Sequence, residues 1–305
     1  MNNLGRDKLD WSQDIWKLID QAVHDEAKQT KVAAQFLPLR PYPDAMTVPS
    51  DTINPQTMQV DQGVVTPIVE IWVEFALTAE QVAAEKDLHT AVTLATRATN
   101  LLSQGEDLLI FQGNDAINDD LFKSNRIRMR GGPAGDGLLK SAKETIPIDP
   151  VDDGSGKYGE NTFAAVAKAY ADLQGKGQYG PYALVLPTVP YADTYAPLKS
   201  TLVTPADRIK PLVTAGFYGT GTLPRPNGSN PDATFKGVLV SLGGNTIDLV
   251  VGMDATTAFM QVDDQGLYRF RVFERFALRP KDGTAIVDLA FAAKAGRTRA
   301  AGAGR

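Results

Sequence analysis

The sequence predicts an α+β fold, in which helices and mainly antiparallel strands are mixed without a βαβ repeat. Three observations predict it. The N-terminal region carries an amphipathic helical stripe, a longer helical stripe ends near residue 113, and the chain from residue 237 onward shows short strand patterns separated by Gly, Asn or Asp. No internal repeat is found in the sequence.

The composition limits the classes of function. The 305 residues are 43% hydrophobic, enough for one large or two modest cores, and without cysteine there is no disulfide, thiolate metal site or thiol nucleophile. A net charge of −5 argues against a protein that binds nucleic acid mainly through phosphates. No stretch approaches the ~20 apolar residues of a membrane span, and the N-terminus has no apolar leader, so we expect a cytoplasmic protein without a membrane partner.

The first expected element is an amphipathic helix within residues 1–40. Asp10 is its expected N-cap, with Gln13 three residues later, and Pro38 and Pro41 end the element. The apolar stripe of this helix comprises Trp11, Ile15, Leu18, Ile19, Ala22 and Val23.

Residues 41–77 are expected to form an extended two-stranded arm. Residues 41–63 are rich in Pro, Thr, Gln and Asp, and apolar and polar residues then alternate from Val65 to Leu77. Because a long isolated hairpin is only marginally stable in water, the arm needs a partner surface. This is the first indication of assembly.

The rest of the chain alternates between helices and strands. A capping box formed by Thr78 and Gln81 begins a short helix, and Asp87 is the expected cap of a helix of about 25 residues, roughly 37 Å, that ends at Gly113. We expect loops over 113–160, helices over 163–173, 191–198 and 206–217, and strands over 182–186, 237–242, 247–252, 267–278 and 285–289. The cationic, Ala- and Gly-rich residues 291–305 are expected to form a disordered tail.

No set of catalytic residues is evident. The two histidines, His24 and His89, are better explained as solvated helix residues than as metal ligands. A G-x-G-x-x-G motif at 175–180 follows a helix and precedes a strand, the reverse of a dinucleotide-binding motif. The sequence contains no G-x-S-x-G, P-loop or H-E-x-x-H pattern. We therefore expect no catalytic residues, no metal and no cofactor.

Five short motifs, in this order, resemble those of encapsulins, shell proteins built on the HK97 phage-capsid fold. They are W-K-L-I-D at 16–20, E-D-L-L-I-F-Q-G at 106–113, G-L-L at 137–139, G-P-Y-A-L-V-L at 180–186 and L-V-V-G-M-D at 249–254. The resemblance implies a cargo-facing helix (1–40), an extended arm or E-loop (41–77), a peripheral domain with a spine helix (78–189), an axial domain (190–250), peripheral strands (251–290) and the tail.

The resemblance also implies a function. The chain would be a non-enzymatic subunit of an icosahedral nanocompartment whose partners are copies of itself and a cargo enzyme held by a C-terminal targeting peptide. Family cargo is typically a peroxidase or a ferritin-like iron oxidase, which implies oxidative-stress defence or iron storage. Some relatives bind a flavin near an aromatic residue after the arm, but residues 79–86 contain none, so flavin is not expected here.

Two surfaces follow from the same resemblance. The cargo-peptide groove would comprise Val23, Ala27, Thr30, Lys31, Ala34, Pro38, Asp254, Ala255 and Thr256. Family members often carry a basic and an acidic residue in place of Ala34 and Pro38, so this groove should be more apolar and favour Leu or Ile anchors. The pore loop would comprise Lys199, Ser200, Thr201, Leu202, Val203 and Thr204. Alternatively, these residues are ordinary domain packing and a solvent-exposed connection.

Two other functions remain open from the sequence. A phage major capsid protein would package DNA, whereas an encapsulin would have a neighbouring oxidoreductase with an apolar C-terminal tag. A protease or bacteriocin, a label given to some relatives, would show proteolysis in purified, cargo-free protein.

Overall fold

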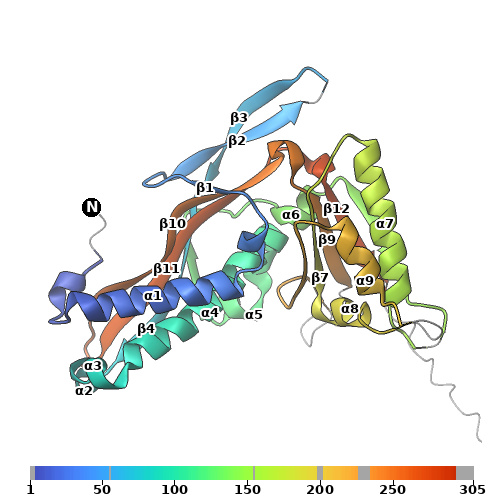
Figure 1. Cartoon of the computed structure of the whole chain (residues 1–305). Coiled ribbons are helices and arrows are strands. Elements are labelled where there is room, and N and C mark those ends of the chain that lie inside the picture. The colour runs from blue at the N-terminus through green and yellow to red at the C-terminus, as the bar shows by residue number, and fades with distance from the viewer. Residues whose placement is uncertain (1–3, 55, 154, 198–201, 226–233, 293–305) are drawn as a thin grey trace, which may run out of the picture.

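The computed structural model describes residues 4–54, 56–153, 155–197, 202–225 and 234–292. These residues form two five-stranded sheets and a separate two-stranded hairpin (Figure 1). None of the helices in the described ranges has both the length and the apolar composition that a membrane span requires. Residues 293–305, most of the expected tail, lie outside the described ranges, but Phe291 is buried at the end of a strand rather than in a tail.

The first sheet is covered on one face by two long helices, α1 (Gln13–Thr30) and α4 (Thr90–Gln112) (Figure 1). Its strand order is β1 (Leu39–Pro41), β10 (Ile247–Val262), β11 (Tyr268–Pro280), β4 (Val69–Leu77) and β5 (Arg128–Arg130). Shorter elements around it are η1 (Arg6–Lys8), η2 (Ala33–Gln35), α2 (Ala79–Ala83), α3 (Glu85–Leu88), η3 (Gly113–Asn118), α5 (Asp120–Lys123) and α6 (Gly137–Ser141).

The first helix begins later and is rotated relative to the expectation. Its N-cap is Ser12, whose side chain accepts a hydrogen bond from the Ile15 N–H, and not Asp10. The buried residues of α1 are Trp16, Ile19, Val23 and Ala27, whereas the side chain of Leu18 is exposed. This face packs against α4 and the first sheet, so the helix buries its apolar side within its own chain.

The long helix α4 is capped by a side chain that the sequence reasoning missed. Asp87 is not its cap; the buried carboxylate of Glu85 accepts hydrogen bonds from the N–H groups of Ala91, at 2.6 Å, and Val92. A carboxylate at this end also interacts favourably with the helix dipole. At the other end of α4, Gly113 has a φ of 59°, and a Cβ there would lie 2.3 Å from the carbonyl oxygen of Gly135. Glycine is therefore required where α6 approaches the end of α4.

The second sheet draws its strands from distant parts of the sequence. Its order is β6 (Glu144–Ile148), β12 (Ile286–Phe291), β9 (Phe235–Ser241), β7 (Tyr182–Pro187) and β8 (Gly216–Thr220). The helical segments of this part are α7 (Gly159–Gly175), α8 (Thr188–Asp193), α9 (Pro205–Ile209), η4 (Lys210–Leu212), η5 (Gly243–Asn245) and η6 (Gly283–Ala285). Every residue of β7 is buried, so this strand lies at the centre of a core.

This sheet changes the expected division of the chain. Strands β8 and β9 of the expected axial segment, 190–250, lie in one sheet with β6, β7 and β12, and α7 packs on the same core. The expected division had instead assigned β6, β7, β12 and α7 to the peripheral domain. Strand patterns show which face is buried but not which strand lies alongside. Two local predictions were also wrong: 113–160 contains helices and two strands rather than loops only, and 206–217 is helical only as far as Leu212.

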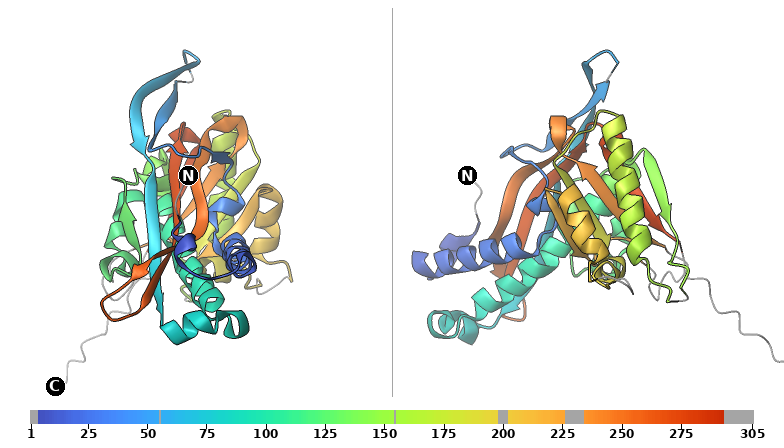
Figure 2. Two further views of the ribbon diagram at one scale, coloured as in Figure 1. Left: turned by 90° about the vertical axis from the view of Figure 1, so that its left-hand side faces the viewer. Right: turned by 45° about the vertical axis from the view of Figure 1, so that its right-hand side comes forward.

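The arm is shorter than expected. It consists of β2 (Thr47–Asn54) and β3 (Gln59–Pro67), which pair with each other and project from the body (Figure 2). Residues 69–77 instead form β4 inside the first sheet, where Val69, Ile71 and Leu77 are buried in the core. A single alternating pattern continues across the boundary at Ile68, so no local pattern marks the change of strand pairing there.

Candidate functional site

A groove of about 910 Å³ lies between α1, the edge strand β1 and β10. Its walls are largely apolar and include Leu39, Leu249, Val251, Phe276 and Tyr218. The parallel pairing of Leu39 with Leu249 brings β1 alongside β10 and so brings together two segments about 200 residues apart. An apolar groove with a few polar groups has the chemistry to bind a peptide through aliphatic side chains.

Four of the predicted groove residues line this groove: Ala27, Lys31, Ala34 and Asp254. The other five do not. Val23 is fully buried beneath α1, and Thr30 faces a different pocket, where its hydroxyl donates to Ser103. Pro38, Ala255 and Thr256 are absent from the lining. Residues that sequence reasoning missed are Leu39, Leu249, Val251 and Phe276, which strand pairing in the first sheet brings together, and Tyr218 of the second sheet, whose ring stacks on Phe36.

An ionic cluster of Lys31, Glu106, Glu274 and Asp254 lies in the groove. The Lys31 ammonium contacts Glu274 Oε2 directly and lies 2.5 Å from Glu106 Oε2 and 3.7 Å from Asp254 Oδ1. The side chains of Glu106 and Glu274 are only 3% and 2% exposed, whereas that of Asp254 is 63% exposed at the rim. Burial lowers the pKa of Lys31, but the two glutamates outweigh it and hold that pKa above its ordinary value.

Glu274 has a shift that follows from the same geometry. Burial, together with the neighbouring Glu106 carboxylate, raises the pKa of Glu274 well above its ordinary value, and Lys31 only partly opposes this. Two buried carboxylates share one ammonium, so the buried part of the ionic cluster carries one excess negative charge unless a proton is bound.

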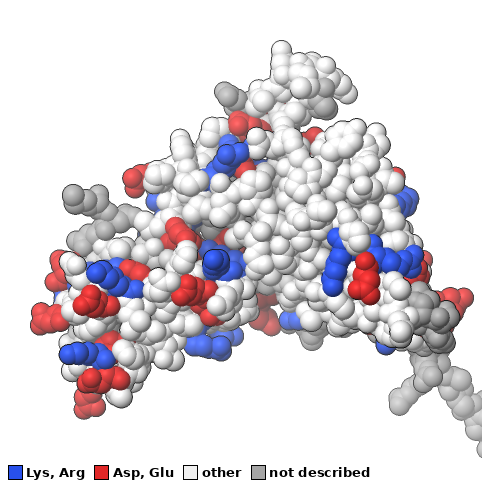
Figure 3. Space-filling view, in the orientation of Figure 1, with Lys and Arg blue, Asp and Glu red and all other residues white. Residues whose placement is uncertain are grey.

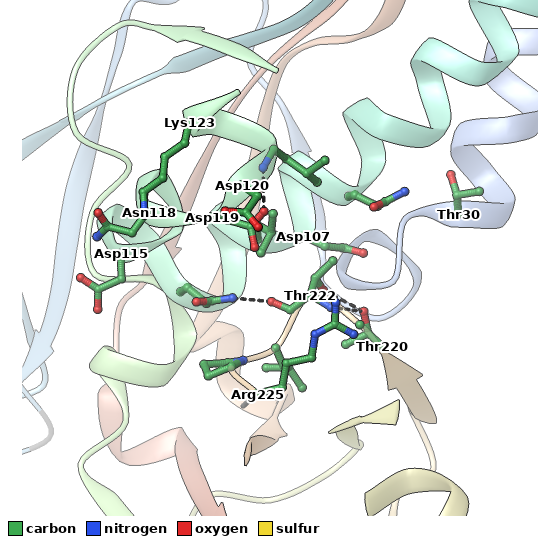
Figure 4. A pocket seen from close by; sticks show the side chains of 17 residues that line it. Thr30, Asp107, Asp115, Asn118, Asp119, Asp120, Lys123, Thr220, Thr222 and Arg225 are labelled. Atoms are coloured by element: carbon green, nitrogen blue, oxygen red, sulfur yellow. Dashed lines mark hydrogen bonds between the residues drawn. The ribbon is translucent and has the colours of Figure 1, made fainter. Parts of the chain in front are cut away.

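Asp107, next to Glu106 on α4, points away from the groove. Its carboxylate accepts hydrogen bonds from the N–H groups of Val32, at 3.0 Å, and Ala33, at 2.9 Å, and so holds the turn after α1. Burial raises the pKa of Asp107 to about 7, although these two N–H groups lower it. Asp107 also lines a second pocket of about 840 Å³, which is polar and includes Thr30 and Arg225 (Figure 4). Within the described residues no group of three or more His, Asp or Glu side chains is arranged to hold a metal ion.

Comparison with known proteins decides the family. A family model described as an encapsulating protein for peroxidase matches residues 1–120 and 135–277. The chain belongs to the encapsulin shell-protein family. This encapsulin is 31% identical over 199 residues to the type 1 encapsulin shell protein EncA of Myxococcus xanthus, an alignment that covers 65% of this chain and 58% of that protein's length.

Solved structures show the same fold at low sequence identity. The virus-like particle of Pyrococcus furiosus matches with a TM-score of 0.66 at 18% identity, over 90% of this chain and 98% of that one. The SrpI encapsulin of Synechococcus elongatus matches with a TM-score of 0.54 at 10% identity, over 85% of this chain and 86% of that one. The capsid of Myoviridae phage XM1 matches with a TM-score of 0.55 at 13% identity, over 86% of this chain and 92% of that one. The predicted α+β class and HK97-type capsid fold are confirmed.

Only part of the predicted pore loop of the encapsulin can be located. Lys199, Ser200 and Thr201 lie outside the described residues. Leu202 is 95% exposed, and Thr204 is the N-cap of α9, where its hydroxyl and that helix's Asp207 form a capping box. The Thr204 side chain is therefore engaged in holding the helix, and a pore-lining role stays a prediction.

Proposed function

We propose that copies of this chain assemble into a closed icosahedral shell that encloses a cargo enzyme. The observation that carries the proposal is the arm: Val48 at its base is buried on the first sheet, but three other apolar residues of the arm are exposed, Met58 by 83%, Val65 by 60% and Val60 by 51%. Charged residues gather over α1 and α4, whereas the arm is mostly uncharged (Figure 3). Exposed apolar surface of this kind is typical of a protein–protein interface.

The arm would be buried on a neighbouring copy, as the E-loop of the family resemblance implies. A two-stranded hairpin is marginal in water, and identical subunits that each donate an arm to a neighbour can close into a symmetric shell. The whole particle, its cargo and a cytoplasmic location belong to this proposal. A peroxidase is the first cargo class to test, because the matching family model is described by that enzyme; a ferritin-like iron oxidase is the second.

The groove is proposed as the site that captures the cargo's C-terminal targeting peptide. Its support is the apolar wall formed by Leu39, Leu249 and Phe276 beside α1. With Ala34 on its lining, the groove offers small and aliphatic contacts, which suits a peptide with Leu or Ile anchors.

The assembly proposal is tested by adding charge to the tip of the arm. A Met58→Asp/Val60→Asp variant should remain a folded monomer or small oligomer, with a far-UV circular dichroism spectrum like that of the unaltered protein and no particles by light scattering or negative-stain microscopy. Burying these carboxylates on a neighbour would oppose docking. The matched control is Thr57→Asp/Gln59→Asp, which adds the same charge at exposed polar positions and should still form particles. Normal particles from the first variant would refute the role of the arm.

A further inference from the structure

The buried part of the ionic cluster has two carboxylates and one ammonium. Glu106 and Glu274 come from α4 and β11, and the ammonium between them is that of Lys31, the C-cap residue of α1. Glu274 Oε1 is buried and accepts no hydrogen bond from any group in the described part of the chain. An uncompensated buried carboxylate is strongly unfavourable, so a further proton or cation is needed here.

The other charged groups around the groove do not supply that cation. On α1, Lys28 is exposed, and the His24 ring lies at the rim, 4.0 Å from Asp254 Oδ2. On β11, the Arg275 guanidinium donates to the carbonyl oxygen of Ala45, at 2.6 Å, at the base of the arm. On β10, Asp254 adds a further negative charge at the mouth.

We propose that this cluster is a subsite for a basic side chain of the docked peptide, so that a Lys or Arg enters beside the aliphatic anchors and pairs with Glu274. This rests on the proposed peptide-binding role of the groove and adds to it a requirement for positive charge. The carboxylates run from the exposed Asp254 at the rim to the buried Glu274, and both line the groove. A cationic side chain therefore meets negative charge first at the mouth and then at the floor.

The subsite makes peptide binding depend on pH. Burial and the neighbouring Glu106 raise the pKa of Glu274, so an unoccupied cluster tends to hold a proton that a cationic side chain must displace. Binding of a basic peptide therefore releases a proton and weakens as the pH falls. Binding of a neutral peptide through aliphatic contacts alone lacks this dependence.

The test uses assembled shells and pairs of fluorescent peptides. Both peptides of a pair contain the same two Leu and one Ile. At one polar position one peptide carries Arg and the other carries citrulline, which has the same shape without charge. Different pairs place this position at different points along the peptide. For at least one pair, the Arg peptide should bind unaltered shells about tenfold more tightly at pH 8, as expected for a close buried charge pair. That preference should decrease as the pH is lowered, because protonation of Glu274 competes with binding of the cationic side chain.

Two variants locate the effect. Glu274→Gln keeps the side-chain shape and should reduce the Arg preference to twofold or less while the citrulline peptides still bind. Asp254→Asn, at the solvent-exposed rim, should retain most of the preference because water and salt screen that charge. If Glu274→Gln fails to form shells, the unaltered protein decides: an Arg preference that stays constant as the pH is lowered to the limit at which the shells remain intact overturns the inference.

The outcomes separate this inference from the peptide-binding role. If Arg and citrulline peptides bind equally, the basic subsite is refuted and the groove remains a peptide site. An Arg preference that persists in Glu274→Gln also refutes the subsite. If no peptide of either kind binds, the peptide-binding role is wrong and the subsite with it.

Discussion

Val23 and Leu39 are both aliphatic residues near the groove, but their surroundings differ. Val23 is fully buried in the core, whereas the side chain of Leu39 is 49% exposed on the groove wall. Replacing Val23 should therefore affect folding, and replacing Leu39 should affect peptide capture. The resemblance had placed Val23 in the groove, so the comparison tests the correction directly.

Val23→Ala removes two buried methyl groups. At about 0.8 kcal/mol each for transfer from water, plus the cavity that remains, the variant should lose about 2 to 3 kcal/mol of unfolding free energy. Its melting temperature should fall by several degrees. Shells that do form should still capture cargo, because the groove lining is intact.

Leu39→Asp should give the opposite result. Since about half of the Leu39 side chain is already in water, its loss should change the unfolding free energy by only about 1 kcal/mol. A docked apolar peptide would bury the new carboxylate at a penalty of at least about 2 kcal/mol, which weakens binding roughly thirtyfold. Leu39→Ala controls for the loss of contact without the charge.

The assay combines thermal unfolding of purified shells with co-purification of a reporter that carries an apolar C-terminal tag without basic residues. The expected pattern is a lower melting temperature with retained reporter for Val23→Ala, and a near-normal melting temperature with lost reporter for Leu39→Asp. The reverse pattern, or reporter capture unaffected by Leu39→Asp, would refute the placement of the groove.

Three further predictions concern buried carboxylates. Glu85→Ala removes the cap on Ala91 and its neighbour and should lower the unfolding free energy by about 1 to 2 kcal/mol in chemical denaturation, whereas an unchanged value would contradict the capping role. Burial raises the pKa of Asp107 to about 7, so the folded state holds this proton more tightly than the unfolded state does. The unfolding free energy should therefore decrease by up to about 4 kcal/mol as the pH rises from about 4 to about 7. In Asp107→Asn, the melting temperature measured across this pH range should depend less on pH. Burial raises the pKa of Asp248, but its ion pairs with Arg279 and a neighbouring lysine outweigh burial and hold that pKa below its ordinary value. The stabilisation by Asp248 is therefore lost only as the pH falls below about 4. Asp248→Asn should lower the unfolding free energy by about 3 kcal/mol at neutral pH, and an unaltered melting temperature would rule this out.

Much of the local structure follows from the sequence. The helical stripe that ends at Gly113 predicted α4 to within a few residues, and the capping box of Thr78 and Gln81 is present. Alternation correctly identified the strand over 69–77, with Val69, Ile71 and Val73 buried. These features depend on neighbours three or four residues apart in a helix, or two apart in a strand, so a short window of sequence contains them.

What only the tertiary structure decided is which segments meet. Lys31 and Glu274 are 243 positions apart, and no periodic pattern relates them, yet they form the floor of the groove. Alternation in the sequence likewise could not show that the arm ends at Pro67 and that β4 begins a different sheet. Hydrophobic periodicity records that a face is buried, whereas the identity of the covering surface depends on long-range pairing, and that pairing determined the groove, the ionic cluster and the extent of the arm.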